Sequence, residues 1–185
     1  MGGTDEGLSE VTAVIRTARL VLRAPAPEDA AAIYATYASD PEATRFMGWP
    51  RHEKVSTTEW FVSMSAHEWR SYGTGTYLVF VGDTLVGSTG LHVDTKTPGE
   101  VATGYILGKA HWGHGYATEA CRAMVELARA RGDHRIGAYC HADHAASARV
   151  LEKSGLGFQG IRPRYVVFPN LGPELADVRV YALDL

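Results

Sequence analysis

The sequence predicts an α/β fold in which helices cover one mixed β-sheet. Three observations lead to this class. The length of 185 residues fits one compact domain. Hydrophobic residues make up 45% of the chain and charged residues 21%, which is the balance of an ordinary globular protein. Strand-like and helix-like segments follow one another in the order β-α-α-β-β-β-α-β-α-β-β, which is typical of a sheet covered by helices.

The N-terminal quarter predicts a tail, a strand, a helix and a loop. We expect a flexible tail over residues 1–15 and one domain over residues 16–185. Residues 19–24 are rich in Leu and Val and end at prolines, which predicts a strand. Residues 28–38 begin with Glu and Asp and continue with Ala, Ile and Tyr, which predicts a helix with acidic residues at its positive end. Residues 41–53 are expected to form a loop.

A second helix is predicted from about Ser56 to Tyr72. The four residues Ser-Thr-Thr-Glu that start it match a capping box, in which the first and last side chains bond free backbone N–H groups. Trp60, Met64 and Trp69 recur at helical spacing and predict its buried face.

The middle of the chain predicts a meander of antiparallel strands. Residues 76–81 and 85–92 are rich in β-branched and aromatic side chains, and the short segment 82–84 between them contains Gly and Asp, which predicts a hairpin. A loop with Pro and Gly then leads into a third strand over 101–107.

The C-terminal half returns to alternating helices and strands. A long helix follows Gly115, and its apolar residues Ala117, Ala120, Cys121, Met124, Val125 and Ala128 fall on one face. The remaining predicted elements are a strand over 135–141, a helix over 144–154, and strands over 158–168 and 178–183.

The strand, glycine turn and helix over residues 104–120 form the unit that carries chemistry. Gly113 and Gly115 precede a helix start, where backbone N–H groups are unpaired and a partial positive charge accumulates. Glycines let these groups approach a phosphate, so the pattern predicts a phosphate or pyrophosphate site. No Gly-Lys-Ser/Thr follows, which excludes a Walker loop, and Thr118 stands where a dinucleotide fingerprint needs its third glycine.

Composition excludes several classes of protein. A net charge of -3 argues against nucleic-acid binding through a basic surface. The sequence contains no apolar segment of membrane-spanning length, and its N-terminus lacks the basic and apolar regions of a secretory signal. Cys121 and Cys140 make no disulfide framework and fall on predicted core faces. We therefore expect a cytoplasmic protein that binds neither nucleic acid nor membrane.

A combination of segments resembles the GNAT N-acetyltransferases, and among them the RimJ/RimL-type branch. The central segment is Trp112–Ala120 (Trp-Gly-His-Gly-Tyr-Ala-Thr-Glu-Ala). The other matching segments are Ala145–Lys153, Gly155–Leu156, Arg19–Arg23, Leu85–Leu91 and Asp177–Tyr181. The resemblance covers residues 17–185. It implies a single-domain GNAT-like fold with a mixed, mostly antiparallel, twisted sheet of about six to seven strands and four helices. It also implies acetyl-CoA as cosubstrate, bound in a splay between two central strands.

The resemblance further implies which residues bind acetyl-CoA. A strand would pair with the pantetheine amides, and a loop with the first helical turn would hold the pyrophosphate. His144, where the family commonly has Asn, could bond a pantetheine amide, and its charge would titrate near neutral pH. The implied residues are Tyr105, Ile106, Leu107 and Gly108 on the strand, Trp112, Gly113, His114, Gly115, Tyr116, Ala117 and Thr118 at the loop and helix start, and His144 and Ser147 in the last helix.

The implied reaction is direct attack of a primary amine on the thioester in a ternary complex, and the amine must lose a proton. Many relatives carry a Glu as base where this chain has Ala102, and other branches use a Tyr as acid where it has Leu151. Ser147 matches a serine that can lie near the thioester sulfur. Glu100 shares strand parity with position 102 and is the first candidate for a replacement base. Further candidates are His92, His111, His141 and Tyr139.

Two other functions stay open at this stage. The missing Glu and Tyr would also suit a non-catalytic acyl-CoA-binding or regulatory module. Five histidines between His111 and His144 suggest a metal site. Their spacing matches no standard ligand pair, however, and we predict no metal. The acceptor is expected to be a protein N-terminus or a small-molecule amine. The sequence leaves the oligomeric state open between a monomer and a homodimer.

Overall fold

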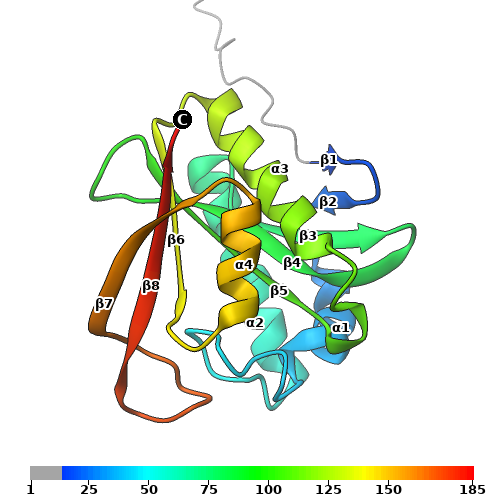
Figure 1. The fold of residues 1–185 in the computed structure, drawn as a ribbon. Coiled ribbons are helices and arrows are strands. Elements are labelled where there is room, and N and C mark those ends of the chain that lie inside the picture. The colour runs from blue at the N-terminus through cyan, green and yellow to red at the C-terminus, as the bar shows by residue number, and fades with distance from the viewer. Residues whose placement is uncertain (1–13) are drawn as a thin grey trace, which may run out of the picture.

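The computed structural model describes residues 14–185, and its centre is one eight-stranded sheet with helices on both faces (Figure 1). The strand order across the sheet is β1-β2-β3-β4-β5-β6-β8-β7. The strands are β1 (Val14–Arg16), β2 (Val21–Arg23), β3 (Thr76–Val81), β4 (Thr84–Val93), β5 (Glu100–Leu107), β6 (Arg135–His141), β7 (Gly157–Val167) and β8 (Leu175–Asp184). The predicted α/β class and each predicted strand are confirmed.

The helical segments include the four predicted and one short turn, η3, that was not predicted. The first is composite, with a tight turn and a π-type turn on either side of a short α-helix. In chain order the segments are η1 (Pro27–Asp29), α1 (Ala30–Ile33), η2 (Tyr34–Ala38), α2 (Val55–Tyr72), η3 (Lys109–His111), α3 (Tyr116–Arg131) and α4 (Ala145–Lys153). No helix within residues 14–185 is long and apolar enough to cross a membrane.

The sheet has one strand more than predicted. Val14–Arg16 pairs antiparallel with Val21–Arg23, and a turn in which Thr17 N donates to Leu20 O (2.9 Å) joins the two. Residues 14 and 15, which the prediction places in the tail, belong to this edge strand. The rest of the predicted tail lies outside the described residues. Three residues are too few to give the alternation by which strands are recognised.

The predicted capping box at the start of α2 is wrong. The helix begins two residues earlier than the pattern implies, with Lys54 rather than Ser56 at the N-cap and no side-chain cap bond. Thr58, in the middle of the pattern, is buried and its hydroxyl pairs with His52 Nδ1 at 2.8 Å. Ser56 therefore lies inside the first turn, where it cannot act as an N-cap.

The predicted buried face of α2 is only partly right. Trp69 packs edge-on against Tyr77, with ring centroids 4.8 Å apart. Trp60 and Met64, however, are 65% and 47% exposed. The helix instead turns Val62 and two small polar residues toward the sheet, which lets it approach the strands closely.

All strand pairs except one are antiparallel. The exception is the β5–β6 pair, which is parallel and is connected by the crossover helix α3. Two hydrophobic clusters fill the two layers around the sheet. One lies under α3 and α4 and includes Cys121, Met124 and Ile136. The other lies under α1 and α2 and includes Val62 and Ile106. Both cysteines are buried and free, as predicted.

The close approach of β4 to β5 depends on Gly87. A Cβ added at Gly87 would lie 2.1 Å from the backbone oxygen of Ile106 and 2.8 Å from Leu107 Cα. We predict that Gly87→Ala lowers the free energy of unfolding by about 3 kcal/mol, because backbone rather than a flexible side chain must move. Gly137→Ala is the matched control, since its nearest contact would be an ordinary 3.7 Å to Tyr181 O. Urea denaturation of both variants measures the difference, and equal losses would contradict the prediction.

Candidate active site

A splay opens between β5 and β6 at the centre of the sheet. The two strands pair only over Glu100–Ala102 and Arg135–Gly137, although both continue for several residues, and they then diverge (Figure 1). Gly108 N donates to Val86 O on β4 (2.9 Å), so the alternation of antiparallel bonds directs the even-numbered residues of β5 to β4. The N–H and C=O groups of Thr103, Tyr105 and Leu107 consequently face the splay.

The four predicted strand residues are therefore not equivalent. Tyr105 and Leu107 turn backbone groups into the splay, while Ile106 is bonded to β4 and its side chain is buried under α1 and α2. Gly108 uses its N–H on Val86 and its C=O to accept from His111 N at 2.9 Å. The backbone oxygen of Leu107 accepts from Trp112 Nε1 at 2.9 Å, so this indole closes the end of the strand.

The predicted glycine loop lies beside the open end of the splay and runs into α3. Gly113 and Gly115 both have φ of +80°, in the left-handed region that favours glycine. Gly115 is the N-cap of α3, and no side chain caps the first turn. A Cβ added at Gly113 would meet nothing within 4 Å, so the loop is open on that side. Thr118 stands in the first helical turn, as predicted, and the loop has the geometry of an anion-binding helix start.

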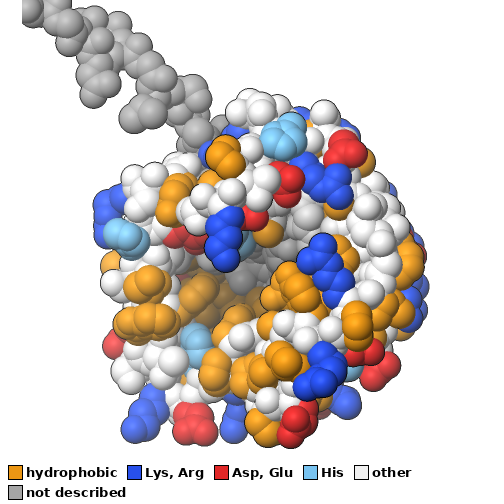
Figure 2. All heavy atoms as spheres, turned by 90° about the vertical axis from the view of Figure 1, so that its left-hand side faces the viewer, with side chains coloured by type: hydrophobic (Ala, Val, Ile, Leu, Met, Phe, Trp, Pro, Cys, Tyr) orange, Lys and Arg blue, Asp and Glu red, His pale blue; other side chains and the backbone are white. Residues whose placement is uncertain are grey.

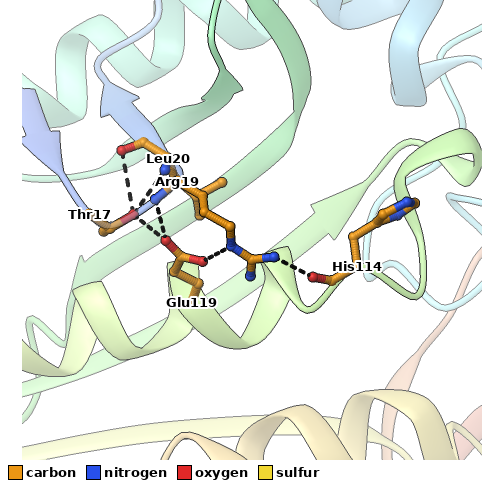
Figure 3. A network of polar contacts seen from close by, with 5 residues as sticks. All are labelled: Thr17, Arg19, Leu20, His114 and Glu119. Atoms are coloured by element: carbon orange, nitrogen blue, oxygen red, sulfur yellow. Dashed lines mark hydrogen bonds and ion pairs between the residues drawn. The ribbon is translucent and has the colours of Figure 1, made fainter.

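Arg19 ties this loop to the start of the domain (Figure 3). Its Nε donates to Glu119 Oε2 (2.7 Å) and its Nη1 donates to the backbone oxygen of His114 (2.8 Å). Thr17 Oγ1 donates to the other carboxylate oxygen of Glu119 at 2.7 Å. Burial alone would raise the pKa of Glu119, but the hydrogen bonds from Thr17 and Arg19 outweigh it and hold that pKa below its ordinary value. The carboxylate therefore stays charged and keeps Arg19 in place.

The two aromatic rings of the loop complete this arrangement. The guanidinium of Arg19 lies 4.8 Å from the centroid of the Tyr116 ring. The His114 and Tyr116 rings stack with centroids 5.4 Å apart and an interplanar angle of 11°. The network joins residues about one hundred positions apart, and no local sequence signal predicts it.

Ser147 lies across the splay from β5, on α4. The Tyr105 hydroxyl approaches its Oγ to 2.9 Å and donates to its backbone oxygen at 3.0 Å. Burial raises the pKa of Tyr105 far above its usual range, so the hydroxyl remains protonated and available as a donor. Two of the predicted site residues are thereby brought into direct contact.

His144 occupies the N-cap position of α4 without a side-chain cap bond. Its ring is stacked on Phe46, with ring centroids 4.4 Å apart. Burial is the main cause that lowers the pKa of His144, and the nearby charges of His141 and Arg45 add to it. The ring is therefore neutral at pH 7, with one nitrogen as donor and the other as acceptor. Titration near neutral pH, expected from the sequence, is shifted to lower pH.

The α1–α2 face of β5 and β6 is largely uncovered. Ala102, Gly104 and Tyr139 point to this face and are exposed. Figure 2 views the molecule from the side of β7 and β8, where the surface is hollowed and hydrophobic side chains gather on the floor and rim of the hollow. The site therefore has two sides, the splay under α3 and α4 and an open, mostly apolar surface opposite.

The loop between η2 and α2 borders this open surface. A Cβ at Gly48 would lie 3.8 Å from the Tyr139 hydroxyl. Asn170 fastens the loop from the β7–β8 connection, because its side-chain nitrogen donates to Thr44 O (2.7 Å) and Trp49 O (2.9 Å). Sequence analysis missed Asn170, since a lone Asn beside a proline signals only a turn.

The candidate bases occupy different rows of the sheet. Glu100 forms the first β5–β6 pair with Arg135, two residues farther from the open end of the splay than Ala102. His92 pairs with Ala102 itself across β4 and β5. Its Nδ1 lies 2.6 Å from Glu68 Oε1. Leu151, which replaces the tyrosine of other branches, is buried in the core under α4.

The clustered histidines are spread over separate places. His141 and His144 meet at Phe46, while His111 and His114 lie around the glycine loop. Among the residues described, no three His, Cys, Asp or Glu side chains come together in a group that could hold a metal ion.

The acetyltransferase (GNAT) domain model matches residues 19–157, which is most of the chain. The chain belongs to the GNAT acetyltransferase family. Its GNAT relatives include YoaA of Bacillus subtilis, an uncharacterised N-acetyltransferase that is 30% identical over 173 residues, 92% of this chain and 96% of that protein. The predicted family and the predicted class of enzyme, an acyltransferase, are confirmed.

Solved GNAT structures confirm the fold. RimL, a ribosomal L7/L12 α-N-protein acetyltransferase in complex with coenzyme A, gives a TM-score of 0.81 at 20% identity, over 93% of this chain and 98% of RimL. MccE, the microcin C7 self-immunity acetyltransferase in complex with acetyl-CoA and AMP, gives 0.85 at 17% identity, over 97% of this chain and 100% of MccE. The likeness to RimL agrees in fold with the RimJ/RimL-type resemblance.

The stacked position of His144 generates a prediction. Phe46→Ala should admit water to the imidazole and raise the pKa of His144 toward the ordinary value of about 6.5, because hydration favours the charged form. The imidazole proton shifts in an NMR pH titration give the midpoint directly. Phe158→Ala, which removes an exposed ring from β7, is the control and should leave it unchanged. An unchanged midpoint in Phe46→Ala would show that the stack does not shield this ring.

Proposed function

We propose that the chain is an acetyl-CoA-dependent N-acetyltransferase that transfers the acetyl group directly to a primary amine in a ternary complex. The observation that carries this proposal is the position of the glycine loop at the open end of the β5–β6 splay. An anion site and an unpaired strand edge are thereby adjacent, as a phosphorylated cofactor with an amide-containing arm requires.

In this proposal the loop Trp112–Gly115 and the first turn of α3, Tyr116–Thr118, hold the pyrophosphate. The left-handed glycines and the uncapped helix start support it, because they offer N–H groups with no Cβ in front of them. The pantetheine arm then pairs with Tyr105 and Leu107, whose backbone groups face the splay, and runs past His144. A neutral His144 can donate to or accept from one of its amides.

Ser147 is proposed to lie near the thioester sulfur. Its Oγ pairs with the protonated Tyr105 hydroxyl (2.9 Å), so a donor is available for the sulfur when the C–S bond breaks. The leaving thiolate needs little help, because the pKa of a thiol is only about 8.5.

The acceptor amine is proposed to arrive from the opposite face. Ala102 and Gly104 leave β5 without bulky side chains there, and both residues are exposed. A protein N-terminus and a small-molecule amine are both compatible with this open surface, and RimL, which has the same fold, is named an α-N-protein acetyltransferase. The oligomeric state stays open between a monomer and a homodimer, and the cytoplasmic location and the domain limits stay predictions.

Release of free thiol from acetyl-CoA tests the proposal. Mixed with N-terminal peptides, polyamines or aminoglycosides, the protein should release CoA thiol in step with N-acetylation of one acceptor class. Protection against thermal unfolding by acetyl-CoA without turnover across the panel would favour the non-catalytic binding module. Neither protection nor thiol release would reject both.

A pair of isosteric variants tests the pyrophosphate position. Asn and Asp tolerate left-handed backbone better than most residues, and a side chain at Gly113 meets no protein atom nearby. We expect Gly113→Asp to weaken CoA binding by at least about a hundredfold relative to Gly113→Asn, because a carboxylate would face the pyrophosphate. Calorimetric titration with CoA measures both. Equal affinities of the two variants for CoA would show that the pyrophosphate does not lie at this loop.

Arg19 generates a second binding prediction. Arg19→Ala removes the tie between Glu119 and the His114 carbonyl and should weaken CoA binding roughly tenfold, the effect of about 1.4 kcal/mol. Arg129→Ala serves as control, since it breaks an exposed pair with Glu126 (2.7 Å) toward the other end of α3. If both variants bind CoA alike, Arg19 contributes to folding alone.

A further inference from the structure

A hydrogen-bonded pair between α2 and β4, formed by Glu68 and His92, is not used by any part of the proposed cofactor site. His92 Nδ1 lies 2.6 Å from Glu68 Oε1, and the two side chains are 42% and 26% exposed. The pair is therefore neither a core contact nor a freely solvated surface pair. Its environment indicates what it does.

Two glycines make room for the pair. A Cβ added at Gly90 would lie 2.3 Å from His92 Nε2, and one added at Gly75 would lie 2.8 Å from Glu68 Oε2. The imidazole therefore extends along β4, with Nε2 as its atom nearest the space over Gly90. Any other residue at position 90 would displace the ring.

The register of the sheet shows where Nε2 points. His92 pairs with Ala102, and Ala102 pairs with Gly137, which is the last β5–β6 pair before the strands diverge. Gly90 pairs with Gly104, one step farther toward the open end of the splay. The ring is thus directed from the closed end of the splay toward its opening.

The surface of β5 beside Gly90 is open, because a Cβ added at Gly104 would meet nothing within 4 Å. Gly90 and His92 share a sheet face with Ala102 and Gly104, and both β5 residues are small and exposed. Neighbouring strands lie about 4.8 Å apart, so the space over β5 accommodates an amine nitrogen and one water.

We propose that His92 is the general base of the acetyl transfer and that Glu68 is its positioning residue. The inference rests on the proposed function. The Glu68 carboxylate accepts the Nδ1–H bond, which leaves the lone pair of the neutral ring on Nε2. This lone pair lies over Gly90, one row nearer the opening of the splay than Ala102, the position at which the carboxylate is absent.

The proposed step is balanced in protons and electrons. The amine nitrogen bonds to the thioester carbonyl carbon, and its N–H proton passes to His92 Nε2, directly or through one water. The C–S bond breaks with its electron pair on sulfur. The imidazolium returns the proton to the thiolate through solvent, so an amine and acetyl-CoA give an N-acetylamine and CoA thiol.

The other charged side chains around His92 are few. Glu68 faces it from α2, and Asp94 and Glu100 follow on the same face at the ends of β4 and β5. From β3, and the turn before it, the neighbours are the uncharged Gly75 and Thr76. Glu68 is the carboxylate that contacts the ring, so we expect its removal to change activity by altering the position and tautomer of His92.

Steady-state kinetics of the full chain with acetyl-CoA and the best acceptor of the peptide, polyamine and aminoglycoside panel test the proposal. His92→Gln should lower kcat at pH 7 by at least about a hundredfold, with the affinity for CoA unchanged. The deficit should shrink as pH rises, because more of the acceptor, whose pKa is roughly 8 to 10, is already deprotonated. Glu68→Gln should lower kcat about tenfold and leave KM for acetyl-CoA unchanged.

His67→Gln and Glu59→Gln are matched controls, since both residues are exposed on α2 and should retain full activity. If the pair were only structural, His92→Gln and Glu68→Gln would both lower thermal stability. They would leave kcat of the folded enzyme and its pH profile unchanged, and this result would overturn the proposal. A pH-independent loss would also overturn it, and loss in Glu100→Gln with His92→Gln active would assign the base to Glu100. If the wild-type chain itself releases no thiol, the proposed function fails; if it does and His92→Gln matches it, only this inference fails.

Discussion

The parallel contact between β5 and β6 ends after three residue pairs, and the rest of the site depends on that ending. Parallel neighbours need a crossover, which here is α3. The crossover helix must begin beyond the carboxyl end of β5, so its positive end falls beside the opening of the splay. The free edge of β5 and the anion-binding helix start are therefore neighbours by topology.

The same divergence of β5 and β6 leaves an opening through the sheet between the two strands. On the α3–α4 side the splay is bordered by Tyr105 and Ser147, which are held together by a hydrogen bond. On the other side it is bordered by Ala102 and Gly104, which leave the floor of the sheet bare. Two substrates approaching from opposite faces can meet there without passing through the core. This geometry suits direct transfer in a ternary complex better than transfer through a covalent enzyme intermediate.

The parts of the site that are local in sequence could be predicted, and those that depend on distant residues could not. Gly113, Gly115 and the helix after them are adjacent, so backbone freedom and helix electrostatics suffice to identify them. Arg19 and Glu119 meet only because β1, β2 and α3 pack together. The capping-box pattern failed because the helix begins at Val55 with Lys54 at the N-cap, which leaves Ser56 inside the first turn.

The proposed general base, His92, could not have been chosen from the sequence alone. Parity along β5 favours Glu100, because period-two alternation is the information that one strand contains. It cannot show that a residue of β4 is in register with Ala102, since register is set by the whole hairpin. His92 therefore stood among several histidines of equal standing until the strand pairing was known. The sheet, and not the spacing along the chain, distinguishes it.

The absence of a carboxylate at position 102 and the presence of His92 are then two sides of one arrangement. A Glu side chain at Ala102 would rise from the same face, one strand away, and would fill the space through which Nε2 reaches the splay. It would also place a second negative charge close to Glu68 and compete for the imidazole. Conversely, a small residue at 102 leaves a gap that only a longer side chain from a neighbouring strand can span. His92 can reach toward it because Gly90 leaves room for Nε2 and Glu68 holds Nδ1. We therefore expect a side chain at position 90, or the loss of the Glu68 carboxylate, to change the position of the imidazole.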